Sequence, residues 1–329
     1  MDYPECINSS NLYTGIGSYA SNMCEIVGNK KLLSLVLDKR HNDYPGEILY
    51  PRKGSLLNRY VINGMFPKFI YGLENKFYHY LDTGIMPLSE DGIVTVHDLY
   101  HPKNESFAIK KVRELKINKF RKFQNVISIS ETTKKTLIEQ GFNKESIEVI
   151  HLSAPAGWKK YENVQEIREK FRLPQNVKIA LTVGDGYFKN NLLVTKALKN
   201  SDFVHVHIGT EAGEIKFNKV SLNDLNQIIC ASDVLIRVSS EEGFGLPPVQ
   251  AITLGVPIVV SRTPVFQELF GNSVIYAEIN RESILESVKI AVKEKYEYLE
   301  KTSKYASYFS FDAFRERMDN YYGKINFPS

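Results

Sequence analysis

The chain has 329 residues, of which 43% are hydrophobic and 24% are charged, and its net charge at pH 7 is +4. A chain of this length is too long for a single hydrophobic core, so we expect two domains. The composition excludes a disordered or membrane-spanning protein. The basic residues are interspersed with acidic ones, which argues against a nucleic-acid-binding protein, whereas a small anionic ligand fits the charge.

We expect no targeting segment at the start of the chain, because Asp2 and Glu5 stand where an apolar run would be needed. Three cysteines, Cys6, Cys24 and Cys230, lie far apart and lack a C-x-x-C spacing, so we expect neither a disulfide framework nor a zinc site. Both observations predict a cytoplasmic protein.

Short apolar runs alternate with helix-length segments along the first half, the pattern of βαβ units on a parallel sheet. We expect strands at residues 32–37, 48–50, 77–81, 93–97, 126–130 and 147–152. Residues 1–10 precede the first helix but lack the apolar run of a central strand. A strand there is expected to be absent or irregular.

The second half repeats the pattern and predicts a second sheet. Its strands are expected at residues 178–183, 203–208, 234–238, 257–260 and 274–276. Between the halves, the segment His151–Lys160 carries Pro155 and Gly157 and is predicted to be the linker.

After the second sheet, Phe311, Phe314 and Met318 recur at helical spacing and predict a final helix that crosses back onto the first domain. The expected domains are therefore residues 1–155 together with 311–329, and residues 156–310.

The sequence around Glu242 predicts a strand, a turn and a helix. The strand at residues 234–238 leads into two glutamates and two glycines, Pro247 or Pro248 starts a helix, and Gly255 ends it. In parallel α/β sheets ligands bind at such junctions, because helix N-termini expose unpaired N–H groups there.

The stretch EEGFGLPPVQ at residues 241–250 resembles the signature of the retaining GT-B glycosyltransferases of family four, in which a Glu precedes Gly-Phe-Gly-Leu-Pro and a second acidic residue follows eight positions later. Glu242 matches the first position and Gln250 stands at the second. The resemblance implies that Glu242 holds hydroxyls of the transferred sugar and that Gln250 meets the ribose. The donor site would also include Gly243, Phe244, Gly245 and Leu246.

Two further motifs extend the resemblance into the first half. Gly15 and Gly17 open a helix, similar to the family's glycine loop that approaches the donor. His97 and Asp98 end a strand, as in the family motif whose His contacts the transferred sugar. The family has two Rossmann-like domains that face each other across a cleft, so this α/β chain is expected to bind the acceptor mainly on its first domain and the donor on its second.

The chain departs from the family where two cations are expected to meet the diphosphate. Asp185 stands at the Arg position and Asn190 at the Lys position, with Lys189 one place early. Lys189 could serve through a shifted loop, or be an ordinary surface lysine. Arg237, near the end of an apolar strand, and Arg262 are candidate replacement cations, with a salt bridge as the alternative for each. His205 and His207, in a strand away from any motif, are expected to be structural.

The expected reaction is retaining transfer from a UDP- or GDP-type sugar to a glycan, a lipid-linked sugar or a glycoprotein. No cofactor or metal is expected, because no Asp-x-Asp or His cluster appears in any loop. Two alternatives remain open: an inactive homologue that acts as a binding or scaffold protein, and a sugar-nucleotide epimerase.

The segment Ser55–Gly72 mixes Arg59 and Lys68 with apolar and aromatic residues. It is a candidate for peripheral contact with the inner membrane surface or with a lipid-linked acceptor. Packing within the first domain is the preferred alternative, because the polar face is not strongly basic.

Overall fold

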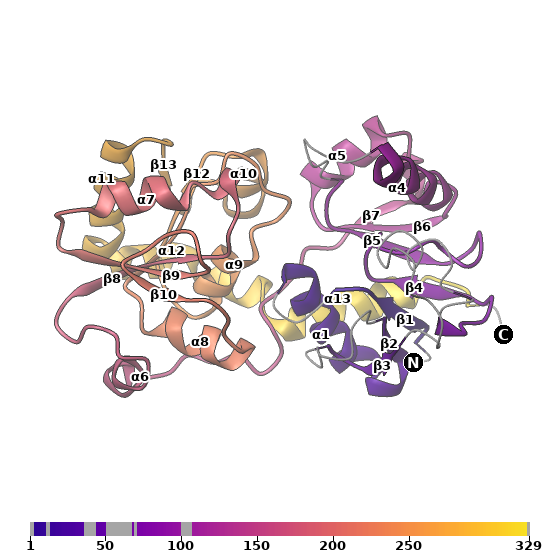
Figure 1. Cartoon of the computed structure of the whole chain (residues 1–329), viewed down its shortest axis with the longest axis horizontal. Helices are drawn as coiled ribbons and strands as arrows, with labels where there is room; N and C mark the ends of the chain where they lie inside the picture. The colour runs from indigo at the N-terminus through magenta and orange to yellow at the C-terminus, as the bar shows by residue number, and fades with distance from the viewer. Residues whose placement is uncertain are drawn as a thin grey trace. The chain divides into compact units, whose positions relative to one another are not determined.

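The computed structural model describes residues 3–10, 14–35, 44–50, 68, 71–99 and 107–327. The chain divides into two compact units: unit 1 is Met1–His151 with Arg315–Ser329, and unit 2 is Leu152–Phe314 (Figure 1). Each unit is built on one parallel sheet with helical crossovers, which confirms the predicted α/β class. Within the described ranges, no helix is long and apolar enough to cross a membrane.

Unit 1 contains a parallel sheet with the strand order β3-β2-β1-β4-β5-β6-β7. The strands are β1 (Glu5–Asn8), β2 (Leu32–Leu35), β3 (Glu47–Leu49), β4 (Tyr78–Tyr80), β5 (Ile93–Val96), β6 (Asn125–Ser128) and β7 (Ile147–Val149). The helices that bear on the argument are α1 (Gly15–Val27), α4 (Phe107–Phe120) and α5 (Glu131–Glu139). Buried aromatic side chains, among them Tyr80, Phe120 and Phe123, fill the core on one face of this sheet.

Strand β1 contradicts the expectation that the first strand is absent or irregular. It lies in the middle of the sheet, paired in parallel with both β2 and β4. Cys6 and Ile7 are fully buried, and the equally buried Asn8 donates to Ser34 Oγ at 3.0 Å and to the Ser10 carbonyl at 2.8 Å. The strand has only four residues and its polar end is satisfied by neighbours, so no long apolar run is needed.

Unit 2 contains a parallel sheet with the order β10-β9-β8-β11-β12-β13. The strands are β8 (Lys178–Val183), β9 (Phe203–Ile208), β10 (Ile215–Phe217), β11 (Val234–Arg237), β12 (Ile258–Ser261) and β13 (Ile275–Ala277). The helices are α6 (Val164–Lys170), α7 (Asn191–Leu198), α8 (Leu222–Cys230), α9 (Leu246–Thr253), α10 (Pro264–Phe270), α11 (Arg281–Lys293) and α12 (Lys295–Tyr308).

This strand order is that of dinucleotide-binding folds, in which the strand order reverses between the first and the fourth strand. In unit 2 the reversal falls between β8 and β11, which pair in parallel. Ligands of such sheets bind at the carboxyl ends of the strands beside this point. The sequence did not predict β10, an edge strand of three partly exposed residues.

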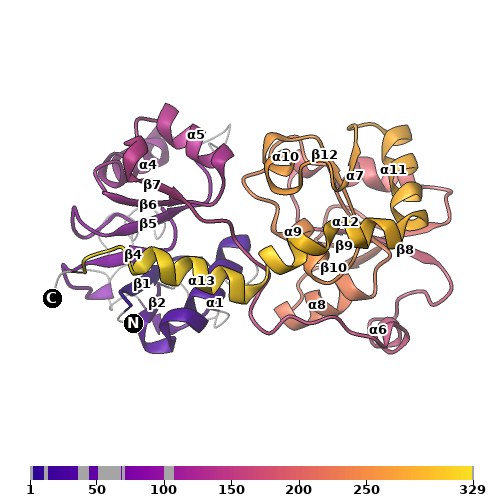
Figure 2. The same cartoon turned by 180° about the vertical axis from the view of Figure 1, so that it is seen from behind.

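The final helix α13 (Phe311–Tyr322) belongs to unit 1 from Arg315 onward, as predicted for a helix that returns to the first domain. The hydroxyl of Tyr322 hydrogen-bonds His79 Nδ1 on β4 at 2.6 Å, and Tyr3 Oη donates to Asp319 at 2.9 Å. Figure 2 shows this helix lying across the strands of unit 1.

Candidate functional site

The carboxyl ends of β8 and β11 carry the residues that the signature singles out in unit 2. Because the two strands are neighbours, the loops that follow them lie side by side. Ser240 N donates to the Phe188 carbonyl at 2.8 Å, and Asn190 Nδ2 donates to the Val238 carbonyl at the same distance. These bonds hold the two loops together.

Glu242 forms a salt bridge with Arg237, the last residue of β11. Nε of Arg237 donates to Oε2 of Glu242 at 2.7 Å, and Nη2 approaches Oε1 at 3.4 Å. Ser239 Oγ donates to Oε2 at 3.1 Å, and Nη1 of Arg237 donates to the Val183 carbonyl at 2.7 Å. Arg237 therefore forms the salt bridge that was the alternative to a diphosphate contact.

The hydrogen bonds of Glu242 leave its carboxylate able to accept from a ligand. Its side chain is 12% exposed and that of Arg237 is 6% exposed, so the pair is largely shielded from water. A carboxylate offers about four acceptor positions, and three donors from Arg237 and Ser239 already use this one. A remaining lone pair can accept a hydroxyl from a ligand.

Lys189 places an amine beside this pair. A Cβ atom at Gly184 would stand 2.6 Å from Nζ of Lys189, so glycine leaves the space that the amine fills. The amine makes no hydrogen bond or ion pair with any residue that the structure describes and lies 5.7 Å from the ring centroid of Phe188. Burial, followed by the charge of Arg237, lowers the pKa of Lys189 to about 8. The charges of Glu242, Asp185 and Glu211 offset part of this lowering, but none of these carboxylates makes an ion pair with the amine, so a hydrogen-bonding anion would be a favourable partner for it.

Asp185 is held in place by four hydrogen-bond donors of the protein. It accepts from His207 Nε2 at 2.9 Å, from Thr210 N and Oγ1 at 2.9 Å each, and from Glu211 N at 3.2 Å. Burial alone would raise the pKa of Asp185, but these hydrogen bonds outweigh it and lower the pKa to about 2. Asp185 thus anchors the loop after β8 to the loop after β9.

The two histidines of β9 are structural, as expected. His205 Nε2 and His207 Nδ1 each lie 2.8 Å from Thr182 Oγ1 on β8, and both side chains are fully buried. Burial lowers the pKa of His205 to about 3, so this ring is neutral.

Helix α9 begins at Leu246, one residue before Pro247, and ends before Gly255, which has φ +70°. Gly245 adopts φ +88°, and a Cβ atom there would lie 2.3 Å from Phe266 Cε1, so only glycine fits. Phe244 and Leu246 are 3% and 8% exposed and pack in the core. These two residues shape the turn and are packed inside the protein.

Gln250 lies in the second turn of α9 and is 3% exposed. Its side-chain amide has no hydrogen-bond partner among the residues of the described ranges. A ligand hydroxyl would therefore be a favourable partner for it.

Arg262, the other candidate cation, follows β12 and is exposed. Its guanidinium lies over the ring of Tyr276, with Cζ 4.3 Å from the ring centroid. The stacking fixes the side chain without using its hydrogen-bond donors.

In unit 1, Gly15 and Gly17 open helix α1 as predicted. Thr14 caps the helix by accepting from Gly17 N at 2.9 Å. Gly15 is exposed and Gly17 is buried, so the first of the two glycines is the one open to a ligand. The cap was not recognised from the sequence, although Thr before a glycine-rich helix start is a typical signal.

His97 lies directly after β5 and is 8% exposed. Its Nε2 is 3.0 Å from the Leu81 carbonyl, which only accepts, so Nε2 carries the proton and Nδ1 has a free lone pair. Burial lowers the pKa of His97, so the ring is neutral at pH 7. The adjacent Asp98 is exposed, and the segment Ser55–Gly72 lies almost wholly outside the described residues.

Two polar residues near these motifs were missed in the sequence. Ser239, three positions before Glu242, supports the carboxylate. Asp82, two residues after the end of β4, accepts from Ser9 N at 2.9 Å and from Gly84 N at 2.6 Å. A polar residue just after an apolar run such as the one that ends at Leu81 is the signal that could have identified Asp82.

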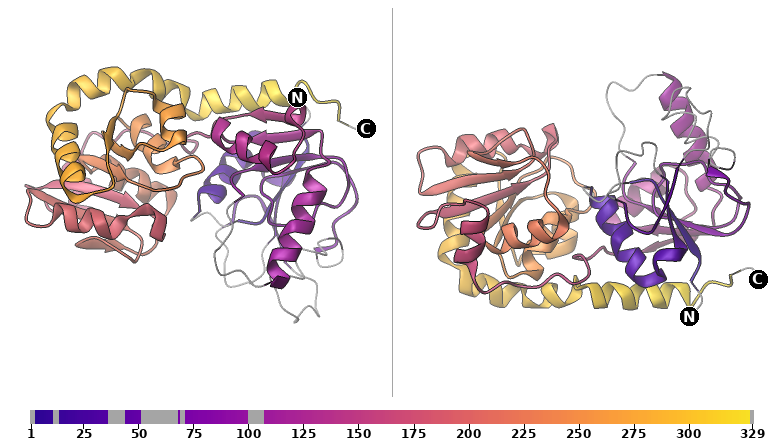
Figure 3. Two further views of the ribbon diagram at one scale, coloured as in Figure 1. Left: turned by 90° about the horizontal axis from the view of Figure 1, so that it is seen from above. Right: turned by 60° about the horizontal axis from the view of Figure 1, so that its bottom comes forward.

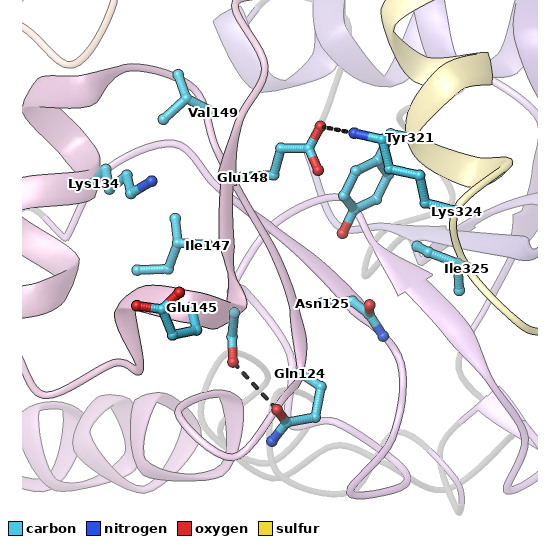
Figure 4. Close-up of a pocket in the computed structure, with 11 residues that line it drawn as sticks. Gln124, Asn125, Lys134, Glu145, Ile147, Glu148, Val149, Tyr321, Lys324 and Ile325 are labelled. Atoms are coloured by element: carbon cyan, nitrogen blue, oxygen red, sulfur yellow. Dashed lines mark hydrogen bonds and ion pairs between the residues drawn. The ribbon is translucent and has the colours of Figure 1, made fainter.

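A cavity of about 340 Å³ lies in unit 1 along strand β7 (Figure 4). Lys134 and Glu145 line it on one side, and Tyr321 and the ion pair of Glu148 with Lys324 line it on the other. None of the residues predicted for the site borders it. Groups of three or more side chains that could hold a metal ion are also absent from the part of the chain that the structure describes.

Residues 163–308 match the family described as "Glycosyl transferases group 1", and this range includes Lys189, Glu242 and Gln250. The O-antigen chain mannosyltransferase RfbU of Salmonella typhimurium is 24% identical over 265 residues, which cover 72% of this chain and 70% of that protein. The O-antigen biosynthesis glycosyltransferase WclY of Escherichia coli is 31% identical over 106 residues, or 32% of this chain and 27% of the relative.

Solved structures resemble the chain over nearly its whole length. A crystal structure of Anabaena Alr3699/HepE in complex with UDP and glucose has a TM-score of 0.74 at 13% identity and covers 98% of this chain and 100% of its own. WaaG, a glycosyltransferase involved in lipopolysaccharide biosynthesis, has a TM-score of 0.68 at 12% identity, with 96% and 97% covered. The chain has the GT-B fold, and residues 163–308 are similar to the group 1 glycosyltransferases.

Proposed function

We propose that the protein transfers a sugar, with retention of configuration, from a UDP- or GDP-type nucleotide sugar to a glycan, a lipid-linked sugar or a glycoprotein. One observation carries the proposal. At the carboxyl ends of β8 and β11 in unit 2, the clamped carboxylate of Glu242 lies beside the unpaired amine of Lys189. This pairing provides an acceptor for sugar hydroxyls and a cation for a diphosphate.

The residues have distinct roles in this proposal. Lys189 binds the diphosphate and stabilises the charge that develops on it as the glycosidic bond breaks. Glu242 accepts from hydroxyls of the transferred sugar, and the amide of Gln250 meets the ribose. The neutral His97 accepts a hydroxyl at Nδ1. Retaining transfer through an oxocarbenium-like state depends more on this electrostatic support than on a single base.

The comparisons support the donor class. The Anabaena protein was crystallised with UDP and glucose and, in a second crystal structure, with UDP-glucose. RfbU is named a mannosyltransferase. Both names describe a protein that handles an activated or transferred sugar, and the present chain shares the fold of the first and part of the sequence of the second.

We also propose that transfer requires no cofactor and no divalent metal, because the amine of Lys189 takes the position of a diphosphate cation. Transfer should persist in EDTA. Activity that is lost in EDTA and restored by magnesium or manganese would contradict this part of the proposal.

The decisive experiment compares wild type with Glu242→Ala and Glu241→Ala on a panel of UDP- and GDP-sugars, with and without simple acceptors. Glu241 is the matched control, since it is the adjacent glutamate and is exposed. Glu242→Ala should reduce transfer roughly tenfold to a hundredfold, because it leaves buried hydroxyls unpaired at ~1–3 kcal/mol. Glu241→Ala should leave the rate unchanged. Nucleotide binding without transfer would indicate a scaffold protein. Conversion of the donor sugar to another sugar in the absence of an acceptor would indicate an epimerase.

A further inference from the structure

A buried network of hydrogen bonds joins helix α1 to helix α13 through two strands of unit 1. On α1, the hydroxyl of Tyr19 lies 2.8 Å from Thr95 Oγ1 of β5. His79 Nε2 of β4 lies 2.8 Å from the same oxygen, and His79 Nδ1 lies 2.6 Å from the hydroxyl of Tyr322 on α13. The right view of Figure 3 shows both helices beside the strands, α1 in indigo and α13 in yellow. We call these four side chains the Tyr19 network.

The Tyr19 network is shielded from water, and its polar groups are paired within the protein. Thr95 and His79 are 0% exposed, Tyr322 1% and Tyr19 3%. Burial lowers the pKa of His79 to about 3, so its neutral ring has one donor and one acceptor nitrogen. Each nitrogen has a hydroxyl partner, which fixes Thr95 and Tyr322 relative to each other.

His97 lies at the end of this network. Thr95 and His97 are two residues apart along β5 and its end, so they lie on the same side of the sheet. The ring centroids of Tyr19 and His97 are 5.0 Å apart and the ring planes meet at 73°, the edge-to-face arrangement that aromatic rings favour. Tyr19 therefore contacts Thr95 through its hydroxyl and His97 through its ring.

The contact with Tyr19 restricts a motion that the hydrogen bond of His97 permits. The bond from Nε2 to the Leu81 carbonyl, 3.0 Å long, holds one atom of the ring but allows the ring to tilt. The lone pair of Nδ1 lies in the ring plane, so the tilt decides in which direction Nδ1 can accept a hydroxyl. A group that binds a substrate has to be held within about 10–20° of its working geometry by packed neighbours.

We propose that Tyr19 is a positioning residue for His97, and that the Tyr19 network makes its position depend on Tyr322 of α13. This inference rests on the proposed function, in which Nδ1 of His97 accepts a hydroxyl of the transferred sugar. Tyr19 is buried, so it acts through the ring of His97 and not by contact with the substrate. The final helix thereby contributes to the orientation of a site residue through side chains buried within unit 1.

Four variants separate the ring, the network and general packing. Tyr19→Leu removes the ring that contacts His97, and Tyr19→Phe keeps this ring but removes the hydroxyl. Tyr322→Phe breaks the network at its far end and leaves Tyr19 packed, so the test does not depend on the folding of Tyr19→Leu. The matched control is Tyr3→Phe, because Tyr3 also donates a tyrosine hydroxyl to α13, at Asp319, but lies outside the network.

The first measurement is the rate at which the Nε2 proton of His97 exchanges with water, followed by NMR in the full chain with ¹⁵N-labelled histidine. It requires no sugar transfer. Loss of the edge-to-face contact should speed this exchange about two- to tenfold in Tyr19→Leu. Tyr19→Phe and Tyr322→Phe should show a smaller increase, and Tyr3→Phe should match wild type.

The second measurement is the rate of sugar transfer with the donor that wild type uses. Tyr19→Leu should lower kcat/KM about two- to tenfold, and Tyr19→Phe should recover most of this loss. Because Tyr19 acts through His97, adding Tyr19→Leu to His97→Ala should cause no further loss. A purely structural role would lower the rate by the same factor in both backgrounds.

The proposal is overturned if the Nε2 proton of His97 exchanges equally fast in wild type, Tyr19→Leu and Tyr322→Phe, or if the losses from Tyr19→Leu and His97→Ala multiply. A match between Tyr322→Phe and Tyr3→Phe would overturn the contribution of α13. If wild type transfers no sugar from any donor, the proposed function fails instead, and proton exchange alone decides whether Tyr19 positions His97.

Discussion

Replacing Arg237 with Met tests the arrangement of the candidate site most directly. The substitution keeps the length and the apolar stem of the side chain but removes the guanidinium that binds both oxygens of Glu242 and the Val183 carbonyl. The two side chains are only 6% and 12% exposed, so the carboxylate would be left poorly solvated with Ser239 as its remaining partner. Breaking a buried pair in this way typically costs about 3–5 kcal/mol.

The interaction can be isolated by a double-mutant cycle. Urea unfolding would be followed for wild type, Arg237→Met, Glu242→Gln and the double variant. The double variant should be more stable than the sum of the single changes implies, by roughly 1–3 kcal/mol, because it removes both charges. Arg237→Lys should lie between wild type and Arg237→Met, since an amine cannot reproduce the fork geometry. A coupling free energy below about 0.5 kcal/mol would refute the clamp on Glu242.

Three further predictions concern neighbouring residues. Since the pKa of Lys189 is lowered to about 8, its charge is lost as the pH rises through that value. Calorimetric affinity for UDP or GDP should therefore fall between about pH 7 and pH 9 in wild type and be weaker and flatter in Lys189→Met; an identical pH profile in both would contradict the diphosphate role. Gln250→Glu should keep or raise nucleotide affinity, because a carboxylate accepts stronger hydrogen bonds than an amide, with repulsion by the diphosphate as the opposing effect; a tenfold loss would exclude the ribose contact. Because the folded pKa of Asp185, about 2, lies below its ordinary 3.8, its contribution to stability is complete above about pH 4 and is lost as the pH falls toward 2. Asp185→Asn should therefore lower the urea midpoint at pH 7 more than at pH 3, and an equal effect at both pH values would be inconsistent with the hydrogen-bonded carboxylate.

The sequence predicted the strands of both sheets well where they form apolar runs. β8 and β9 have the expected bounds, and several other strands differ by one residue or a few. β1 and β10 were missed because the first is short and polar at its end, and the second lies half exposed at an edge. In both, pairing with neighbouring strands stabilises a segment whose own sequence is a weak signal.

The sequence predicted which residues belong to the candidate site better than it predicted which of them pair with one another. Glu242 was selected from the signature, and Lys189 because it lies one place before the position at which the family has a diphosphate lysine. The pairing of Glu242 with Arg237 was not predicted from the sequence. It depends on the turn after β11, which brings Glu242 back to Arg237 at the end of that strand. Likewise, the sequence showed only that Asp185 stands where a cation was expected, and it did not predict that the turn after β9 supplies the donors that hold this carboxylate.

The histidines beneath this loop form a chain of hydrogen bonds that ends at a carboxylate. Thr195 Oγ1, His205, Thr182 Oγ1, His207 and Asp185 are linked in that order at 2.8–3.0 Å. The carboxylate of Asp185 accepts from Nε2 of His207. When Nδ1 of His207 in turn accepts from Thr182 Oγ1, every upstream proton points toward the carboxylate, from Thr195 onward. Burial keeps His205 neutral, so its single proton then lies on Nε2. Asp185 therefore sets the tautomer of a buried ring across two intervening side chains.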